Sequence, residues 1–118
     1  MVSQSLHTFV LPIMEMLYLV PQRESFDEAY LIMEGLSTLR PKLVTDLLIS
    51  TSSIKVKRLF MWMAEKANHQ WVEDLNLSEV DFGSGKRMIV KNGKLDKKYK
   101  ITVPREFEDI LKNFTFPK

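Results

Sequence analysis

The residues of this 118-residue chain best suited to phosphate chemistry are Gly83-Ser84-Gly85-Lys86. A Walker A loop, which binds nucleotide phosphates, has the spacing GxxxxGK followed by Ser or Thr, and it leads into a helix whose N-terminus faces the phosphate. Here position 80 is Val80, Lys86 is followed by Arg87, and the next residues alternate as in a strand. The pattern therefore favours a glycine turn with positive φ angles over a nucleotide site.

Other side chains capable of catalysis or metal binding are sparse. His7 and His69 are far apart in the sequence, and the chain has no cysteine, so no metal-ligand spacing is present. The paired acids Asp27-Glu28 and Glu73-Asp74 are typical of solvated helix faces, and no Ser-His-Asp or acid–base set stands out. We therefore predict that the protein is not an enzyme and has no catalytic residues, metal, cofactor or small-molecule substrate.

Charge is distributed unevenly along the chain. Residues 1–85 hold seven Lys or Arg and eleven Asp or Glu, a net charge of −4, whereas residues 86–105 hold eight cations and one acid, Asp96, a net charge of +7. The eight cations are Lys86, Arg87, Lys91, Lys94, Lys97, Lys98, Lys100 and Arg105. Such an asymmetry indicates either a face that meets an anionic partner or a small exposed element that keeps the protein soluble.

The length of 118 residues suits one hydrophobic core, and we predict a single domain over residues 1–118. No apolar run approaches the roughly 20 residues of a membrane span. The N-terminal residues lack the basic start of a secretory signal. Because the absence of cysteine fits a reducing compartment, we expect a cytoplasmic protein with no membrane partner.

Helix signals occupy the first two thirds of the sequence. Apolar residues at helical spacing continue to Pro21, which ends a first helix. Ser25 and Glu28 form a capping-box pattern ahead of a second helix, and Ile32 is placed in its apolar stripe. Pro41 suits the first position of a third helix that continues to about residue 50.

A fourth helix is predicted where Thr-Ser-Ser precedes IKVKRLFMWMAEKA, with Asn68 as its C-cap. Phe60 and Met63 are expected on its apolar face, and Trp62 falls off that face, so it packs under the β element or lies at an interface. Lys55, Lys57 and Arg58 open this helix, where cations oppose the positive end of the helix dipole. They therefore need an acidic neighbour or an anionic partner.

The hydrophobic period changes after Gly85. Arg87–Val90 alternates, Asn92-Gly93 is a strong turn signal, and Lys100–Val103 is a second strand-like run, which together predict a hairpin closed at Asn92-Gly93. Residues 104–114 predict one final short helix. The predicted fold is therefore α+β and mainly α, with a helical part of about four helices over residues 6–76 and a basic β part, a small C-terminal hairpin, over residues 83–104.

An ordered set of motifs carries a family resemblance. The set comprises the helix start KVKRLF, the His-x-Trp that follows this helix, FGSGKR, the glycine turn with KLDKKY, and ITVPRE; upstream, ESFDEAYLIMEGLSTLRPKLVTDLL matches as well. In these motifs residues 14–109 resemble the C-terminal domain of the AbiE-type abortive-infection antitoxins, which belong to type IV toxin–antitoxin systems. The N-terminal winged-helix domain of that family has no counterpart before residue 14.

The resemblance implies a bifunctional family in phage defence. Its winged helix acts as a transcriptional regulator by repressing the operon's promoter, and its C-terminal domain counters a toxin that resembles nucleotidyltransferases. For this chain the resemblance implies an antitoxin domain that acts through a basic surface. A nucleic-acid-binding accessory domain of a transcriptional autorepressor, contacting DNA or RNA, is the alternative that the +7 stretch leaves open.

Carrying the basic motif over residue by residue gives a set of expected contact residues and a set of supporting ones. The expected contacts with the partner or nucleic acid are Lys55, Lys57, Arg58, Lys86, Arg87, Lys94 and Lys98. The expected structural residues are Gly83, Gly85, Gly93, Trp71 and Tyr99.

Overall fold

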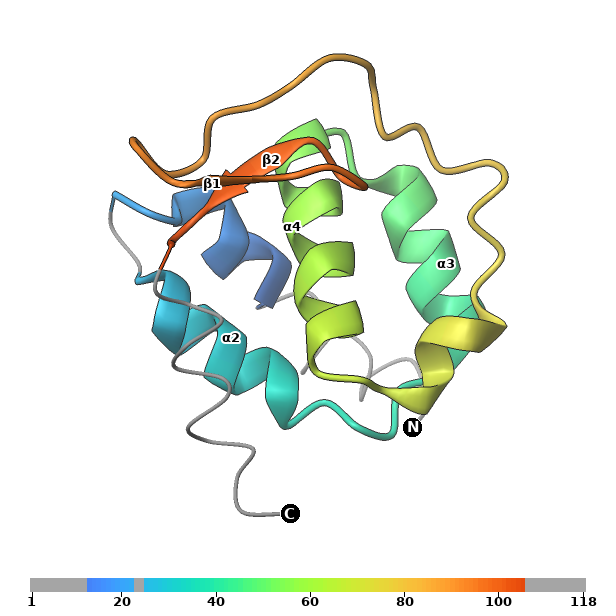
Figure 1. Cartoon of the computed structure of the whole chain (residues 1–118). Helices are drawn as coiled ribbons and strands as arrows, with labels where there is room; N and C mark the ends of the chain where they lie inside the picture. The colour runs from blue at the N-terminus through green and yellow to red at the C-terminus, as the bar shows by residue number, and fades with distance from the viewer. Residues whose placement is uncertain (1–12, 23–24, 106–118) are drawn as a thin grey trace. The chain divides into compact units, whose positions relative to one another are not determined.

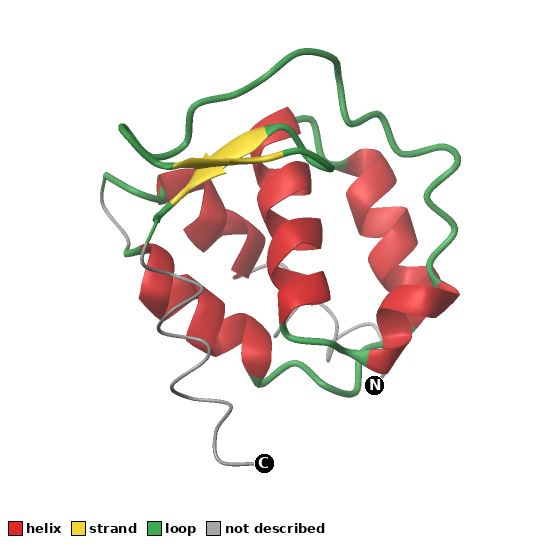
Figure 2. Cartoon of the chain, viewed as in Figure 1, coloured by secondary structure: helices red, strands yellow, loops and turns green. Residues whose placement is uncertain are grey.

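The computed structural model describes residues 13–22 and 25–105. Within them the elements are a helix over residues 13–19, α2 (Phe26–Glu34), α3 (Pro41–Ser50), α4 (Ile54–Lys66), the 3-10 helix η1 (Gln70–Asp74), β1 (Lys94–Asp96) and β2 (Ile101–Val103) (Figures 1 and 2). Four α-helices and one two-stranded antiparallel hairpin confirm the predicted α+β, mainly α class. The predicted helix over residues 104–114 lies almost entirely outside the described residues.

The chain divides into two compact units, residues 1–84 (unit 1) and 85–118 (unit 2). Unit 1 contains all the helices described above, and unit 2 contains the hairpin. In unit 1, α2 packs against α4, and η1 packs against α3. The single domain predicted from the sequence stays a prediction.

The second helix starts at the predicted capping box. Ser25 is the N-cap of α2, and its Oγ accepts a hydrogen bond from the backbone N–H of Glu28 at 2.9 Å. Such a cap is typically worth about 1 kcal/mol. The buried face of α2 consists of Phe26, Ala29, Tyr30 and Met33. The placement of Ile32 in this apolar stripe is wrong: its side chain is 45% exposed, because position 32 lies about 240° around the helix from Phe26.

The third helix begins at Pro41 and ends at Ser50, as predicted. Proline is favourable at this first position because its missing N–H would have no partner inside the helix. Val44 and Leu48 point into the core. Its C-cap, Thr51, donates through Oγ1 to the carbonyl of Leu47 at 2.7 Å.

The fourth helix is capped by Ser53, whose Oγ accepts from the N–H of Val56 at 3.2 Å. Its nine residues from Val56 to Ala64 are all buried, so the single apolar face expected from the sequence is wrong. Asn68 lies one position beyond the C-cap, Ala67, with a φ of 61°. Such left-handed geometry is common for asparagine just after a helix.

Aromatic side chains join these helices. Trp62 is 3% exposed and meets Phe26 of α2 edge to face, with ring centroids 5.5 Å apart. Trp71 donates through Nε1 to the carbonyl of Leu36 at 2.7 Å, and His69 stacks on its ring with a centroid distance of 5.3 Å. The Nε2 of His69 lies 2.7 Å from the carbonyl of Met33, which can only accept, so Nε2 carries the hydrogen. These residues are therefore parts of the core of unit 1.

The hairpin of unit 2 differs from the predicted one. Lys94 pairs with Val103 and Asp96 with Ile101, so residues 97–100 form the connecting loop rather than Asn92-Gly93. Residues 87–90 are not a full strand, and Arg87 alone forms a parallel bridge with Ile101. Asn92-Gly93 does make a turn, since the N–H of Gly93 donates to the carbonyl of Val90 at 3.2 Å. That turn leads into β1 instead of closing the hairpin.

Candidate partner-binding surface

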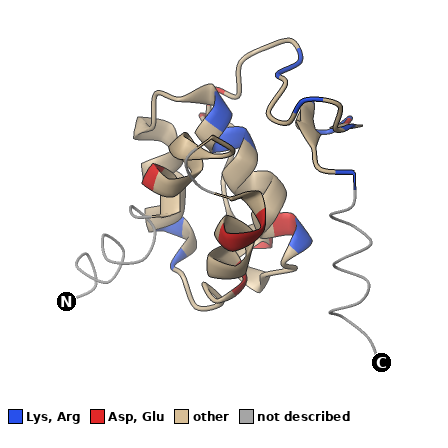
Figure 3. Ribbon diagram, turned by 90° about the vertical axis from the view of Figure 1, so that its left-hand side faces the viewer, with Lys and Arg blue, Asp and Glu red and all other residues tan. Residues whose placement is uncertain are grey.

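The cations of unit 2 are all on its surface. Eight cations are each exposed, and we call this set the basic segment: Lys86, Arg87, Lys91, Lys94, Lys97, Lys98, Lys100 and Arg105. Lys and Arg are blue along the ribbon in Figure 3. Asp96, the one acid among residues 85–105, is only half-buried, and its Oδ2 accepts from the backbone N–H of Tyr99 at 2.7 Å. The part of unit 2 that the structure describes is therefore strongly cationic.

Backbone bonds fix where two of these cations stand. The N–H of Arg87 donates to the carbonyl of Lys100 at 2.8 Å, and the N–H of Thr102 donates to the carbonyl of Arg87 at 3.1 Å. This places Arg87 beside the hairpin loop that contains Lys97, Lys98 and Lys100. Lys94 lies at the other end of the three-residue strand β1. At about 3.3 Å per residue, Lys94 is roughly 10 Å from the start of the hairpin loop.

The side chain of Thr102 holds the segment before the hairpin in place. Its Oγ1 accepts from the N–H of Ile89 at 2.8 Å and from that of Val90 at 3.1 Å. Arg105, just after β2, also fixes a backbone segment, because its Nε donates a hydrogen bond to the carbonyl of Asn92 at 2.9 Å. The cations thus project from a backbone that is hydrogen-bonded on both sides of β2.

Glycines shape the loops of the FGSGKR and NGKL motifs. Gly83 and Gly85 have φ angles of 71° and 79°, which confirms the positive φ predicted for them. At Gly93 the reason for glycine is close approach: a Cβ would lie 2.4 Å from the carbonyl oxygen of Val103. No side chain fits at that distance, so β1 and the end of β2 can meet only at a glycine.

The two aromatic residues expected to support the loops are both buried. Trp71 is 4% and Tyr99 is 8% exposed. Lys98 Nζ lies 5.4 Å from the centroid of the Tyr99 ring, within range of a cation–π contact. Trp71 belongs to the core of unit 1, where it bonds to Leu36.

The three cations at the start of α4 occupy different environments from those of unit 2. Lys55 donates through Nζ to the carbonyl of Tyr18 at 2.9 Å, and desolvation by burial lowers its pKa. Lys57 is 3% and Arg58 is 2% exposed. The Nε of Arg58 donates to the carbonyl of Phe82 at 2.8 Å. Lys57 and Arg58 therefore present little side-chain surface, which a helical spacing in the sequence could not show.

Four residues of the basic segment lie outside the set of expected contacts. These four residues are Lys91, Lys97, Lys100 and Arg105. They are exposed, and so are the four cations of unit 2 that were expected to be contacts. The charge count of residues 86–105 contained this signal, since all eight cations contribute to it. The motif match selected four of these eight cations as contacts. Their side-chain exposure does not distinguish them from the other four.

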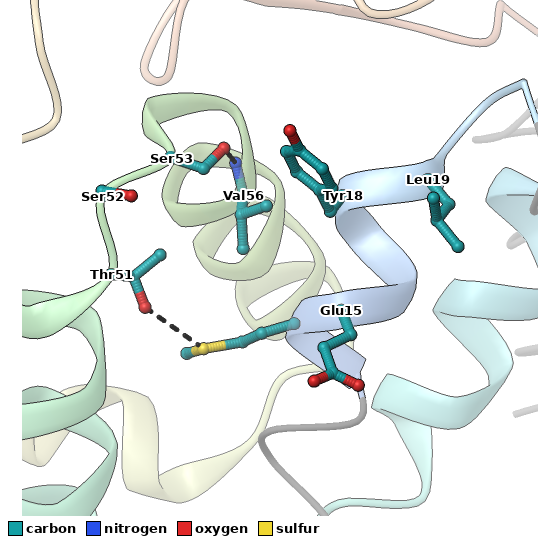
Figure 4. A pocket seen from close by; sticks show the side chains of 8 residues that line it. Glu15, Tyr18, Leu19, Thr51, Ser52, Ser53 and Val56 are labelled. Atoms are coloured by element: carbon teal, nitrogen blue, oxygen red, sulfur yellow. Dashed lines mark hydrogen bonds between the residues drawn. The ribbon is translucent and has the colours of Figure 1, made fainter.

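A pocket of about 500 Å3 lies in unit 1, between the helix over residues 13–19 and the start of α4 (Figure 4). Its walls include Tyr18, Leu19 and Val56, and the Oγ1 of Thr51 lies 3.5 Å from the sulfur of Met14. The hydroxyls of Thr51 and Ser53 already serve as helix caps. Glu15 and Tyr18 are the ionisable residues that line this pocket, and the lining does not assemble a catalytic set.

A second hollow, of about 460 Å3, is lined by Asp46, Asp74 and Glu79 among others. Across the described residues, no group of three or more His, Asp or Glu side chains is arranged to hold a metal ion. In the same residues, no helix combines the length and apolarity that crossing a membrane requires.

A family model described as "Transcriptional regulator, AbiEi antitoxin, Type IV TA system" matches residues 9–104, well over half of the chain. The chain belongs to the AbiEi antitoxin family. This confirms the resemblance drawn from the sequence motifs. Comparison with curated proteins and comparison with solved structures each give no match.

Membership of the AbiEi family indicates the kind of system in which this chain acts. An antitoxin of a type IV toxin–antitoxin system has a cognate toxin, and the family description adds transcriptional regulation. The matched residues include α2, α3, α4 and the whole hairpin, with every cation of the basic segment except Arg105. Both units of this AbiEi chain therefore contribute to the family pattern.

Proposed function

We propose that this chain neutralises a nucleotidyltransferase-like toxin without catalysis, by presenting the basic segment of unit 2 to an anionic surface. The observation that carries the proposal is the exposure of all eight cations next to a single half-buried acid. A cluster of like charges raises the local potential and attracts an oppositely charged partner. Family membership supports a toxin as the object of this contact.

The contact is assigned first to Lys86, Arg87, Lys94 and Lys98, which are exposed, and Lys55 is a partly exposed candidate in unit 1. Lys57 and Arg58 were expected in the same role. With 3% and 2% exposure they offer less surface than the cations of unit 2, and the Arg58 bond to Phe82 supports a role in holding unit 1 together.

Co-expression with the toxin encoded beside this chain tests the proposal. We expect the chain to restore growth, and the double variant Lys86→Gln with Lys94→Gln to restore it less well. Arg40→Gln with Lys42→Gln removes the same charge from exposed positions of unit 1 and is the matched control. If growth stays blocked although the chain is soluble, the proposal fails; if both double variants behave alike, the assignment to the basic segment fails.

A nucleic acid is the second candidate for the anionic partner, favoured by the transcriptional-regulator description and by the same cations. Phosphate contacts predict an affinity that falls with salt, with a slope of about −0.9 per B-DNA phosphate neutralised. Single-strand binders add exposed aromatic platforms, whereas Tyr99, the aromatic residue of the described part of unit 2, is 8% exposed. A gel-shift series with no binding at low salt would exclude this candidate.

A further inference from the structure

We propose that the solvent-facing side of α2 is a docking surface for a protein segment that is both apolar and cationic. This surface, the α2 outer face, consists of Asp27, Glu28, Leu31, Ile32, Glu34 and Gly35, all of which are exposed. It lies in unit 1 and shares no residue with the basic segment. The proposal therefore does not depend on the function assigned to unit 2.

The aliphatic side chains of this face lie outside the buried side of α2. The inner side of α2 already buries Phe26, Ala29, Tyr30 and Met33 against the core. Leu31 is nevertheless 54% and Ile32 45% exposed, and the two are adjacent. Single exposed apolar residues are ordinary, whereas two adjacent ones with charged neighbours form a small apolar patch that a partner could bury.

Helical spacing places carboxylates around Leu31. Residues three and four apart are neighbours on a helix surface, so Leu31 is flanked by Asp27, Glu28 and Glu34. Glu28 is also four residues from Ile32. The sequence of α2, FDEAYLIME, contains no Lys or Arg, so the helix itself supplies no cation to these three acids.

The negative charge of these three carboxylates favours a cationic partner. Phosphates of a nucleic acid and anionic lipid headgroups would be repelled by three carboxylates around the apolar pair. A protein segment with aliphatic side chains flanked by Lys or Arg would bury Leu31 and Ile32 while pairing with the acids. An amphipathic cationic helix has this chemistry, with anchors at helical spacing.

Gly35 adds a feature that the backbone does not require. Its φ is −78°, in the right-handed helical region, and a Cβ there would meet only the carbonyl oxygen of Ile32, at 3.5 Å. An alanine would therefore fit the folded chain. Because Gly35 is four residues beyond Leu31, its missing side chain leaves room for a partner to approach beside Leu31.

Binding of a short synthetic amphipathic helix of Leu and Lys to the full chain, measured by titration calorimetry, tests the proposal. We expect saturable binding that weakens about tenfold or more in the double variant Leu31→Ser with Ile32→Ser. Glu28→Gln should weaken it less and reduce its salt dependence. Asp46→Asn with Glu79→Gln removes acids from elsewhere in unit 1 and should leave the affinity unchanged. A mirror peptide of Leu and Glu can meet the basic segment of unit 2, so any binding of it should be the same in the parent and in the Leu31/Ile32 variant.

Gly35→Ala separates docking from folding. We expect its thermal stability to equal or exceed that of the parent chain while its affinity for the Leu–Lys peptide falls. Equal binding by the parent, the Leu31/Ile32 variant and Gly35→Ala would overturn the proposal. Binding of the mirror peptide that weakens as much as that of the Leu–Lys peptide in the Leu31/Ile32 variant would overturn it too. Concentration-dependent self-association that disappears in the Leu31/Ile32 variant would assign the face to a second copy and overturn the choice of a separate cationic partner.

Discussion

The guanidinium of Arg58 donates through Nε to the backbone carbonyl of Phe82 at 2.8 Å, across 24 residues of sequence. The bond joins the first turns of α4 to the segment that follows η1, inside unit 1. Arg58 is 2% exposed and Phe82 is half-buried, so the bond is largely shielded from water on the Arg58 side. Arg58, which was expected from the sequence to be a partner contact, thus has a bond within unit 1.

Arg58→Ala should therefore destabilise the chain. Loss of a buried donor to a carbonyl costs about 1–3 kcal/mol, and the lost side-chain packing adds to it. Arg40→Ala, at an exposed position, should stay within about 0.5 kcal/mol of the parent. The measurement is the free energy of unfolding in urea, and equal values for the two variants would contradict the structural role of Arg58.

Gly93→Ala should disrupt the hairpin of unit 2. The new methyl group would overlap the carbonyl oxygen of Val103, which is 2.4 Å from the Cβ position. Overpacking of this kind costs about 1–3 kcal/mol and is relieved by moving the strands. Amide chemical shifts of β1 and β2 would report the movement.

Gly85→Ala is the comparison for that variant. Its Cβ position is open, so the cost is the strain of a φ of 79°, about 1–2 kcal/mol, without displacement of the strands. If the shifts of β1 and β2 change as much in Gly85→Ala as in Gly93→Ala, close approach is not the reason for glycine at position 93.

Removing the N-cap side chains of α2 and α4 should lower the stability by a predictable amount. Ser25→Ala and Ser53→Ala each remove a side-chain acceptor from a helix N-terminus, the first bonded to Glu28 and the second to Val56. Each should lower the free energy of unfolding by about 1 kcal/mol. Ser52→Ala, next to the cap but exposed, is the control and should have little effect.

Alkaline pH should weaken unit 1 through Tyr30. Burial, and secondarily the charge of Glu34, raises the pKa of Tyr30 from 10.0 to about 12. The unfolded chain releases this proton near the lower value and the folded chain near the higher one. The stabilisation is therefore complete below the lower pKa and is lost as the pH rises through the higher one.

Unfolding in urea at several pH values across that range checks the effect. Lysine side chains titrate there too, so the informative quantity is the difference between parent and Tyr30→Phe, whose stability should fall less steeply with pH. Tyr18→Phe, at a residue 65% exposed, should follow the parent. Parallel curves for all three proteins would rule out Tyr30 as a source of the alkaline loss.

The helices of unit 1 were predictable because their ends are encoded locally. Ser25, Pro41 and Ser53 each mark a helix start by chemistry that acts within one turn. The burial of α4 was not predictable from such signals. Periodicity identifies a face only when the other face meets water, and nine consecutive residues of α4 are buried.

The hairpin shows where a local signal gave the wrong register. Asn92-Gly93 does form a turn, but the loop that joins the strands is closed by Asp96, whose carbonyl accepts from the N–H of Lys100 at 2.8 Å. Lys100 adopts a φ of 57°, a conformation that sequence rules assign to Gly or Asn. Aspartate at the start of this loop was the available signal, since its carboxylate bonds to a backbone N–H in such turns.

The nine buried residues of α4 also limit which fragments of this protein can be produced in soluble form. A peptide of this helix alone would expose to water the apolar side chains among these nine residues, which are all of them except Lys57 and Arg58. Any fragment that keeps α4 must keep the segments that cover it, or it will aggregate. Among the described boundaries, the junction between residues 84 and 85 leaves α2, α3, α4 and η1 together on one side.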